Sequence, residues 1–142
     1  MNDTPVVMLV VEDNPADALF FKEAVDDTAL PVRHYVVDNG WDALEYLRRQ
    51  GKFAEAERPD VVVLDLNIPL KNGREVLEAM AADPSLSLIP VAILTTSESE
   101  EDLVRLYPPG RCQYLVKTGD FRRLTRIAAN IHELAVACKA PA

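Results

Sequence analysis

The chain has 142 residues, 49% of them hydrophobic, and a formal net charge of −8. This length predicts a single domain over residues 1–142, with a core of about residues 5–135 and a frayed tail over residues 136–142. The acidic balance argues against direct binding of nucleic acid, which needs clustered Lys and Arg, and it suits a metal cation.

The first predicted element is a strand over residues 6–11, which ends at Glu12 and Asp13. A run that is apolar throughout is typical of a strand buried on both faces of a parallel sheet. Asn14 and Pro15 then predict a helix start, with Asn14 as the N-cap and Pro15 in the first turn. Its apolar side chains recur at helical spacing: Ala16, Leu19, Phe20 and Ala24.

Residues 32–37 have mixed polarity and predict an edge strand. Asn39-Gly40 then leads into a helix that fades by Gly51, and we expect Trp41, near the start of this helix, to pack rather than to bind a partner. After a polar loop over residues 51–60, a third strand at residues 61–64 runs directly into Asp65. A carboxylate at the end of a buried strand either caps the strand and faces solvent or is a functional group.

The second half repeats the pattern of strand and helix. A helix carrying Val76, Leu77, Met80 and Ala81 stops at Asp83-Pro84, and a fourth strand over residues 90–94 leads to Thr95. An acid-rich helix follows, which Pro108-Pro109 should shorten or redirect. A fifth strand over residues 113–116 ends at Lys117. The last helix carries Ile127, Ile131 and Leu134, for which we expect a mixture of core and exposed positions.

Five apolar strands alternating with five helices predict an α/β fold, a doubly wound parallel sheet with the flavodoxin-like strand order 2-1-3-4-5. In such a sheet, ligands bind outside the carboxyl ends of the strands, where the strand order reverses. The fold would bring polar residues from four separate strand ends to that edge: Glu12, Asp13, Asp65, Thr95 and Lys117.

These residue types indicate phosphoryl chemistry. Three neighbouring carboxylates need a cation or raised pKa values, and hard oxygen ligands with open positions favour Mg²⁺. A carboxylate beside Mg²⁺ can act as a nucleophile and form an aspartyl phosphate. Lys117 would supply a positive charge for the phosphate, and Thr95 would supply a hydroxyl donor.

Taken together and in order, these residues resemble the receiver domains of response regulators in two-component signalling, over about residues 5–135. The resemblance is carried by the acidic pair after the first strand, the aspartate with its following proline and glycine, the threonine, and the tyrosine with its lysine: Glu12-Asp13, Asp65, Pro69, Gly73, Thr95, Tyr114 and Lys117.

The resemblance implies a role for each matching residue. Asp65 would accept phosphate from a sensor histidine kinase. Mg²⁺ would be held by Asp13 and Asp65, by Glu12 largely through water, and by the backbone carbonyl of Asn67. Thr95 would hydrogen-bond the phosphoryl group, and Lys117 would pair with it. Tyr114 would be the switch residue that becomes buried when Thr95 moves inward.

The resemblance also implies partners. With no room for an output domain, we expect a stand-alone bacterial receiver that acts through protein contacts or a phosphorelay, and not an enzyme beyond its own phosphorylation and slow dephosphorylation. Residues 12–17 and the extended loop after the second helix are similar to receivers paired with bacterial phytochromes. A homodimer would use the face of the fourth helix, fifth strand and fifth helix. The N-terminus lacks an export signal, and Cys112 and Cys138 suit reduced thiols, so we expect a cytoplasmic protein without membrane contact.

The chain departs from the family at Thr118, where receivers usually have a proline, often with a cis bond. Either the Lys117–Thr118 bond is cis, or the loop runs trans and places Lys117 differently. His34 and His132 are expected at surface or packing positions.

Three other functions compete with the receiver interpretation. A Mg²⁺-dependent phosphohydrolase would need a second acid where Asn67 stands. A flavin-binding electron carrier would need a hydroxyl-rich loop where Glu12 and Asp13 stand. A receiver-like scaffold that never binds phosphate would not need the intact set of acids, threonine and lysine.

Overall fold

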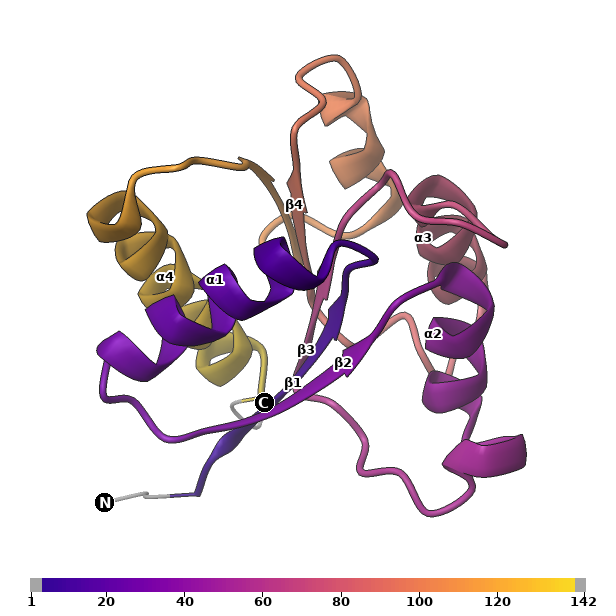
Figure 1. Cartoon of the computed structure of the whole chain (residues 1–142). Coiled ribbons are helices and arrows are strands. Elements are labelled where there is room, and N and C mark those ends of the chain that lie inside the picture. Colours follow the sequence, from indigo (N-terminus) through magenta and orange to yellow (C-terminus); the bar gives the residue numbers. More distant parts are fainter. Residues whose placement is uncertain (1–3, 140–142) are drawn as a thin grey trace.

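A computed structural model describes residues 4–139 and contains one five-stranded parallel sheet in the order β2-β1-β3-β4-β5 (Figure 1). The predicted strand order is therefore confirmed. Every residue of the three central strands is buried, whereas the strands at the two edges are partly exposed. The strands are β1 (Val6–Val11), β2 (Val32–Val37), β3 (Val61–Leu64), β4 (Val91–Thr95) and β5 (Cys112–Val116).

Helices cover both faces of the sheet, with α1 and α4 on one side and α2 and α3 on the other (Figure 1). Each face has its own apolar core, because successive residues of a strand point to opposite faces. Leu9 and Val11 pack on the side of α2 and α3, and Met8 and Val10 on the side of α1. The helices are α1 (Pro15–Asp27), α2 (Gly40–Arg48), α3 (Gly73–Ala82) and α4 (Phe121–Lys139), with 3-10 turns η1 (Gly51–Phe53) and η2 (Glu101–Leu106).

The register of the strands sets which residues meet at the edge of the sheet. Val11 lies beside Leu64, so Glu12 and Asp65 leave the sheet at the same level. On the other side, Thr95 pairs with Val116, and the amide of the following residue, Lys117, donates to the Thr95 carbonyl at 2.8 Å.

Two helices begin at this edge, and α1 has the N-cap that the sequence predicts. The side chain of Asn14 accepts hydrogen bonds from the amides of Ala16 and Asp17, with Pro15 as the first helical residue. At the start of α3, Gly73 packs so closely on the end of β3 that a Cβ there would lie 2.5 Å from the Asp65 carbonyl oxygen. A glycine is needed at this position because backbone atoms occupy the space of a side chain.

Two of the expected element boundaries are corrected. The crossover from β4 to β5 is the short 3-10 helix η2 and not an α-helix, which agrees with the expectation that Pro108-Pro109 shortens it. The C-terminal helix continues to Lys139, so residues 136–139 are not a frayed tail, because Leu134 and Ala135 anchor this last turn in the core. The rest of that expected tail, residues 140–142, lies outside the described residues.

Several packing predictions are also corrected. Trp41, which was expected to pack, is 54% exposed. Leu19, one of the apolar residues at helical spacing in α1, is 57% exposed. Ile131 and Leu134 are buried and Ile127 is half-buried, so this stripe of α4 is a core face and not a mixture.

The histidine and cysteine predictions hold. His34 and His132 are half-buried, and both cysteines are free. None of the helices within residues 4–139 is long and apolar enough to cross a membrane.

Candidate phosphoryl and metal site

Three carboxylates meet at the carboxyl edge of the sheet, as predicted. Glu12 and Asp13 follow β1 and Asp65 follows β3, and one oxygen from each lies within 4.8 Å of the others. Glu12 and Asp65 are only 7% and 6% exposed, whereas Asp13 is open to solvent. An exposed acid beside two buried ones is a set of hard oxygen donors that leaves coordination positions for water, which fits Mg²⁺ or a similar divalent cation.

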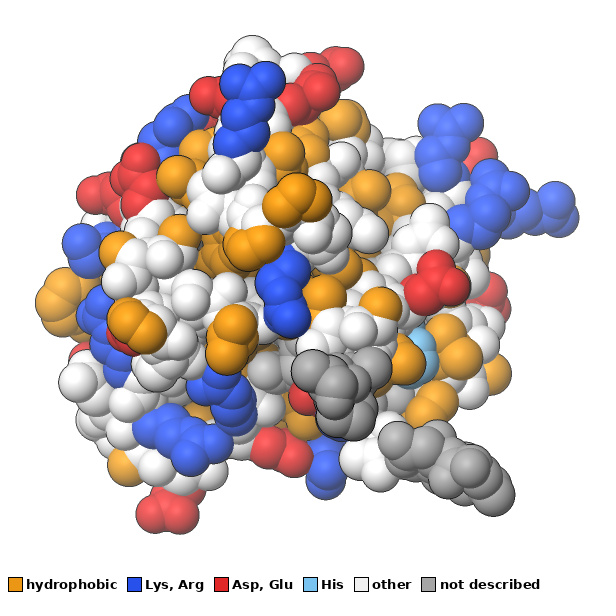
Figure 2. All heavy atoms as spheres, turned by 180° about the vertical axis from the view of Figure 1, so that it is seen from behind, with side chains coloured by type: hydrophobic (Ala, Val, Ile, Leu, Met, Phe, Trp, Pro, Cys, Tyr) orange, Lys and Arg blue, Asp and Glu red, His pale blue; other side chains and the backbone are white. Residues whose placement is uncertain are grey.

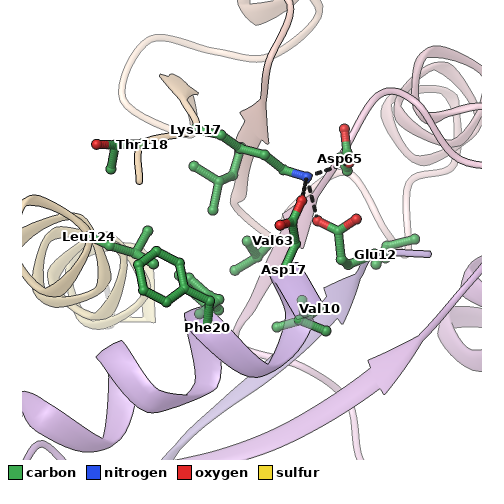
Figure 3. Close-up of a pocket in the computed structure, with 13 residues that line it drawn as sticks. Val10, Glu12, Asp17, Phe20, Val63, Asp65, Lys117, Thr118 and Leu124 are labelled. Carbon is green, nitrogen blue, oxygen red and sulfur yellow. Dashed lines mark hydrogen bonds and ion pairs between the residues drawn. The ribbon is translucent and has the colours of Figure 1, made fainter. Parts of the chain in front are cut away.

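Lys117 compensates the buried acids from the end of β5. Its Nζ lies 2.7 Å from Glu12 Oε1, 2.8 Å from Asp65 Oδ2 and 2.9 Å from Asp17 Oδ2 (Figure 3). Burial alone would lower the pKa of Lys117, but its hydrogen bonds to Asp65, Glu12 and Asp17 raise it well above its usual value. The lysine therefore stays charged at any physiological pH.

Glu12 is costly to ionise in this site. Burial raises the pKa of Glu12 above its usual value, and the negative charge of Asp65 raises it further. The hydrogen bonds from Lys117 and from the Asn14 amide act in the opposite direction. A cation bound at these carboxylates would lower the cost of keeping both of them ionised.

The remaining predicted residues are Thr95, Tyr114 and Asn67, of which Asn67 contacts Asp65 directly. Thr95 is fully buried at the end of β4, and its Oγ1 accepts a long hydrogen bond of 3.4 Å from the Ser97 amide. Tyr114, half-buried on β5, donates its hydroxyl to the Ser97 carbonyl. The amide of Asn67 donates to Asp65 Oδ1 at 3.1 Å, and Asn67 lines the same groove as Asp13.

The Lys117–Thr118 bond is trans, since residues 4–139 contain no cis peptide bond. The lysine nevertheless reaches Asp65 at hydrogen-bonding distance. The loop therefore places the ammonium at the acids without the proline that receivers usually have at position 118.

A cavity of about 60 Å³ lies beneath the lysine, between α1, α4 and the sheet (Figure 3). Its upper wall is the charged group of Lys117, Glu12, Asp17 and Asp65, and its lower walls are apolar. Apolar lining side chains include Val10, Val63, Phe20 and Leu124. Water-sized space therefore adjoins the side chain that bridges the acids.

Two contacts at the site were not predicted. Asp17 in the first turn of α1 is the third carboxylate on Lys117. The predicted helix start at Pro15 was the available signal, since it puts Asp17 in the first turn of the helix that follows the acidic pair. Arg74 on α3 pairs with Glu100 at 3.0 Å beside the groove that Asp13 and Asn67 line, and no sequence motif marks this pair.

Charged side chains are distributed differently on the far face of the molecule than at the site. On the side turned away from the viewer in Figure 1, Lys and Arg side chains alternate with Asp and Glu around the periphery, with hydrophobic side chains between them (Figure 2). No comparable convergence of charged groups on one half-buried side chain occurs elsewhere among the described residues, where the other ion pairs are more exposed.

Comparisons with known proteins agree with this geometry. A family model described as the response regulator receiver domain matches residues 8–129. Response regulator Rcp1 of Synechocystis sp. is 34% identical over 130 residues, which are 92% of this chain and 88% of Rcp1.

Two solved structures are also similar. The phosphorylated cyanobacterial phytochrome response regulator RcpA superposes with a TM-score of 0.83 at 36% identity, covering 96% of this chain and 98% of RcpA. The Mn²⁺-bound form of response regulator Rcp1 superposes with a TM-score of 0.75 at 32% identity, covering 97% of this chain and 98% of Rcp1.

Proposed function

The chain belongs to the response regulator receiver family of two-component signalling, and on that premise we propose that Asp65 accepts a phosphoryl group from a sensor histidine kinase. The observation that carries the proposal is the convergence of Glu12, Asp13 and Lys117 on the Asp65 carboxylate. Asp65 becomes more negative when it is phosphorylated, and this arrangement compensates the added charge.

In the transfer step, an oxygen of Asp65 attacks phosphorus, and the bond from phosphorus to the donor nitrogen of histidine breaks as the new P–O bond forms. The imidazole leaves with the electron pair and takes up a proton. Lys117 pairs with the phosphoryl oxygens as a point charge, and the hydroxyl of Thr95 donates a hydrogen bond to one of them.

The proposed metal is Mg²⁺, held by Asp13 and Asp65, by Glu12 through water, and by the backbone carbonyl of Asn67. The three clustered carboxylates support this assignment, as does the Mn²⁺-bound form of Rcp1. When bound, the ion supplies charge neutralisation for the approach of a phosphate to an acidic site.

The readout we propose is a two-state change around Tyr114. The Tyr114 hydroxyl is held by the Ser97 carbonyl, two residues beyond Thr95, so an inward movement of Thr95 toward a phosphoryl group would pull on the same loop. A phosphoryl group that makes better contacts in one of the two conformations shifts the equilibrium toward that conformation. The size of the shift is set by the difference between its interaction free energies in the two conformations.

The proposed partner is a sensor histidine kinase of the bacterial phytochrome class, which the similarity to RcpA supports. We further propose a stand-alone cytoplasmic receiver. A homodimer would form through η2, β5 and α4, where Leu106 and Val116 are exposed large hydrophobic residues.

The chain's own chemistry would be limited to its phosphorylation and slow dephosphorylation. An aspartyl phosphohydrolase would place a general acid two residues after the nucleophile, and Asn67 occupies that position. A phosphate-independent scaffold has no use for a lysine that holds Asp65 and Glu12 together.

The test is the intact mass of the protein after incubation with a small acyl phosphate and Mg²⁺, for the wild type and for Asp65→Asn. We expect one added phosphoryl group in the wild type and none in the variant. No addition to the wild type, under conditions that modify a control receiver, would contradict the proposal.

A further inference from the structure

The three carboxylates around Lys117 use all of the hydrogen-bond donors of its ammonium group. An ammonium group has three N–H donors, and the Nζ of Lys117 lies within 2.9 Å of three different carboxylates, those of Glu12, Asp17 and Asp65. Pairing with a phosphoryl group on Asp65 therefore requires Lys117 to release at least one of these acids.

The three acids differ in what their release would cost. Glu12 and Asp65 are almost fully buried, so each would be left as an uncompensated charge with little water around it. The Asp17 side chain is 46% exposed, and water can replace the lysine at its carboxylate. Asp17 is also outside the cluster of Glu12, Asp13 and Asp65, so its release leaves the proposed metal ligands in place.

We propose that Asp17 is a positioning residue that holds Lys117 while Asp65 is unmodified and competes with the phosphoryl group for the same ammonium. This inference rests on the proposed phosphoacceptor role of Asp65. Asp17 acts only through Lys117, and its charge sets how strongly the site retains an anion on Asp65. Without this competitor, the lysine has a free donor for the phosphoryl oxygens.

The cavity beneath the lysine makes the exchange sterically simple. Lys117, Asp17 and Asp65 all line it, and its volume of about 60 Å³ accommodates movement of the lysine stem between Phe20 and Leu124. Phe20 and Leu124 belong to α1 and α4, so the core of the sheet stays in place. Lys117, which already contacts Asp65, can then release Asp17 and turn toward phosphoryl oxygens on Asp65 without repacking either helix.

The experiment compares the affinity for beryllofluoride, a tetrahedral mimic of a phosphoryl group on a carboxylate, in the wild type, Asp17→Asn and Asp17→Glu. Glu23→Gln is the matched control, since Glu23 is an exposed acid on the same helix and loses the same charge. Binding is followed by ¹⁹F NMR at saturating Mg²⁺, and the affinity for Mg²⁺ alone is measured separately by calorimetry.

We expect Asp17→Asn to bind beryllofluoride about fivefold more tightly than the wild type, the upper end of the effect of one half-exposed charge pair. Asp17→Glu, which keeps the competing charge, and Glu23→Gln should stay within about twofold of the wild type. Mg²⁺ affinity should not rise in any variant, whereas general damage to the site would weaken both ligands.

Two results would overturn the inference, and they are distinguishable. Uptake of beryllofluoride by the wild type with equal or weaker binding in Asp17→Asn would refute the competition and leave the role of Asp65 intact. No uptake by the wild type at saturating Mg²⁺ would refute the phosphoacceptor role and the competition together.

Discussion

Replacing Lys117 with methionine removes the cation that compensates Glu12 and Asp65, the two most buried acids of the site. Removing one partner of a buried ion pair typically costs about 3–5 kcal/mol, because the remaining charge is left without compensation. Protonation of Glu12, whose pKa is already raised, recovers part of this cost. We therefore expect Lys117→Met to lose about 3 kcal/mol of the free energy of unfolding.

Urea unfolding at pH 7 without divalent cations measures this loss. With a slope of about 2 kcal/mol per molar urea, the midpoint should fall by about 1.5 M. Mg²⁺ should then stabilise Lys117→Met more than the wild type, because the added cation replaces the missing charge at the acids. Lys22→Met is the control, since Lys22 pairs with the exposed Asp26 and should cost less than about 0.5 kcal/mol. A loss below about 1 kcal/mol in Lys117→Met, or equal stabilisation of both proteins by Mg²⁺, would show that Lys117 does not compensate the buried acids.

Three further predictions concern stability. Gly73→Ala should lower the melting temperature by roughly 10 °C, since its Cβ would meet the backbone of Asp65 at 2.5 Å, whereas Gly119→Ala, with nothing within 4 Å, should change it little. Burial lowers the pKa of His34 below its usual 6.5. The folded protein therefore favours the neutral ring, and stability is lost as the pH falls below 6.5 and the ring is protonated. Between pH 8 and pH 5, the melting temperature should fall less steeply in His34→Gln than in the wild type. Asn14→Ala should cost about 1 kcal/mol in urea unfolding through loss of the N-cap, and an unchanged midpoint would count against that assignment.

The positions of the main site residues follow from the sequence because they depend on backbone geometry. Runs of Val and Leu that end in Glu12, Asp65 and Thr95 mark the carboxyl ends of buried strands, and parallel pairing brings those ends to one edge. Lys117 is placed by the same rule at the end of β5. Residue positions that depend only on strand ends and strand order can therefore be predicted from the sequence.

The rest depends on side-chain packing that no periodicity reveals. The contact of Asp17 with Lys117 depends on the angle at which α1 crosses the sheet and on the rotamer of a long side chain. Trp41 is exposed although it is a large apolar residue, because the α2 core face is filled by Ala43, Leu44 and Leu47 instead. The C-terminal limit of α4 depends on tertiary contacts, which override a weak local pattern of helix-ending signals.

Reduction of the phosphorylated protein with borohydride shows whether Asp65 itself carries the phosphoryl group. Borohydride reduces an aspartyl phosphate to homoserine and leaves a free carboxylate unchanged, so peptide mass spectrometry identifies the modified position. We predict homoserine at position 65 only, dependent on the phosphodonor and on Mg²⁺. Homoserine at position 13, or at no position in a protein that has gained phosphate, would contradict it.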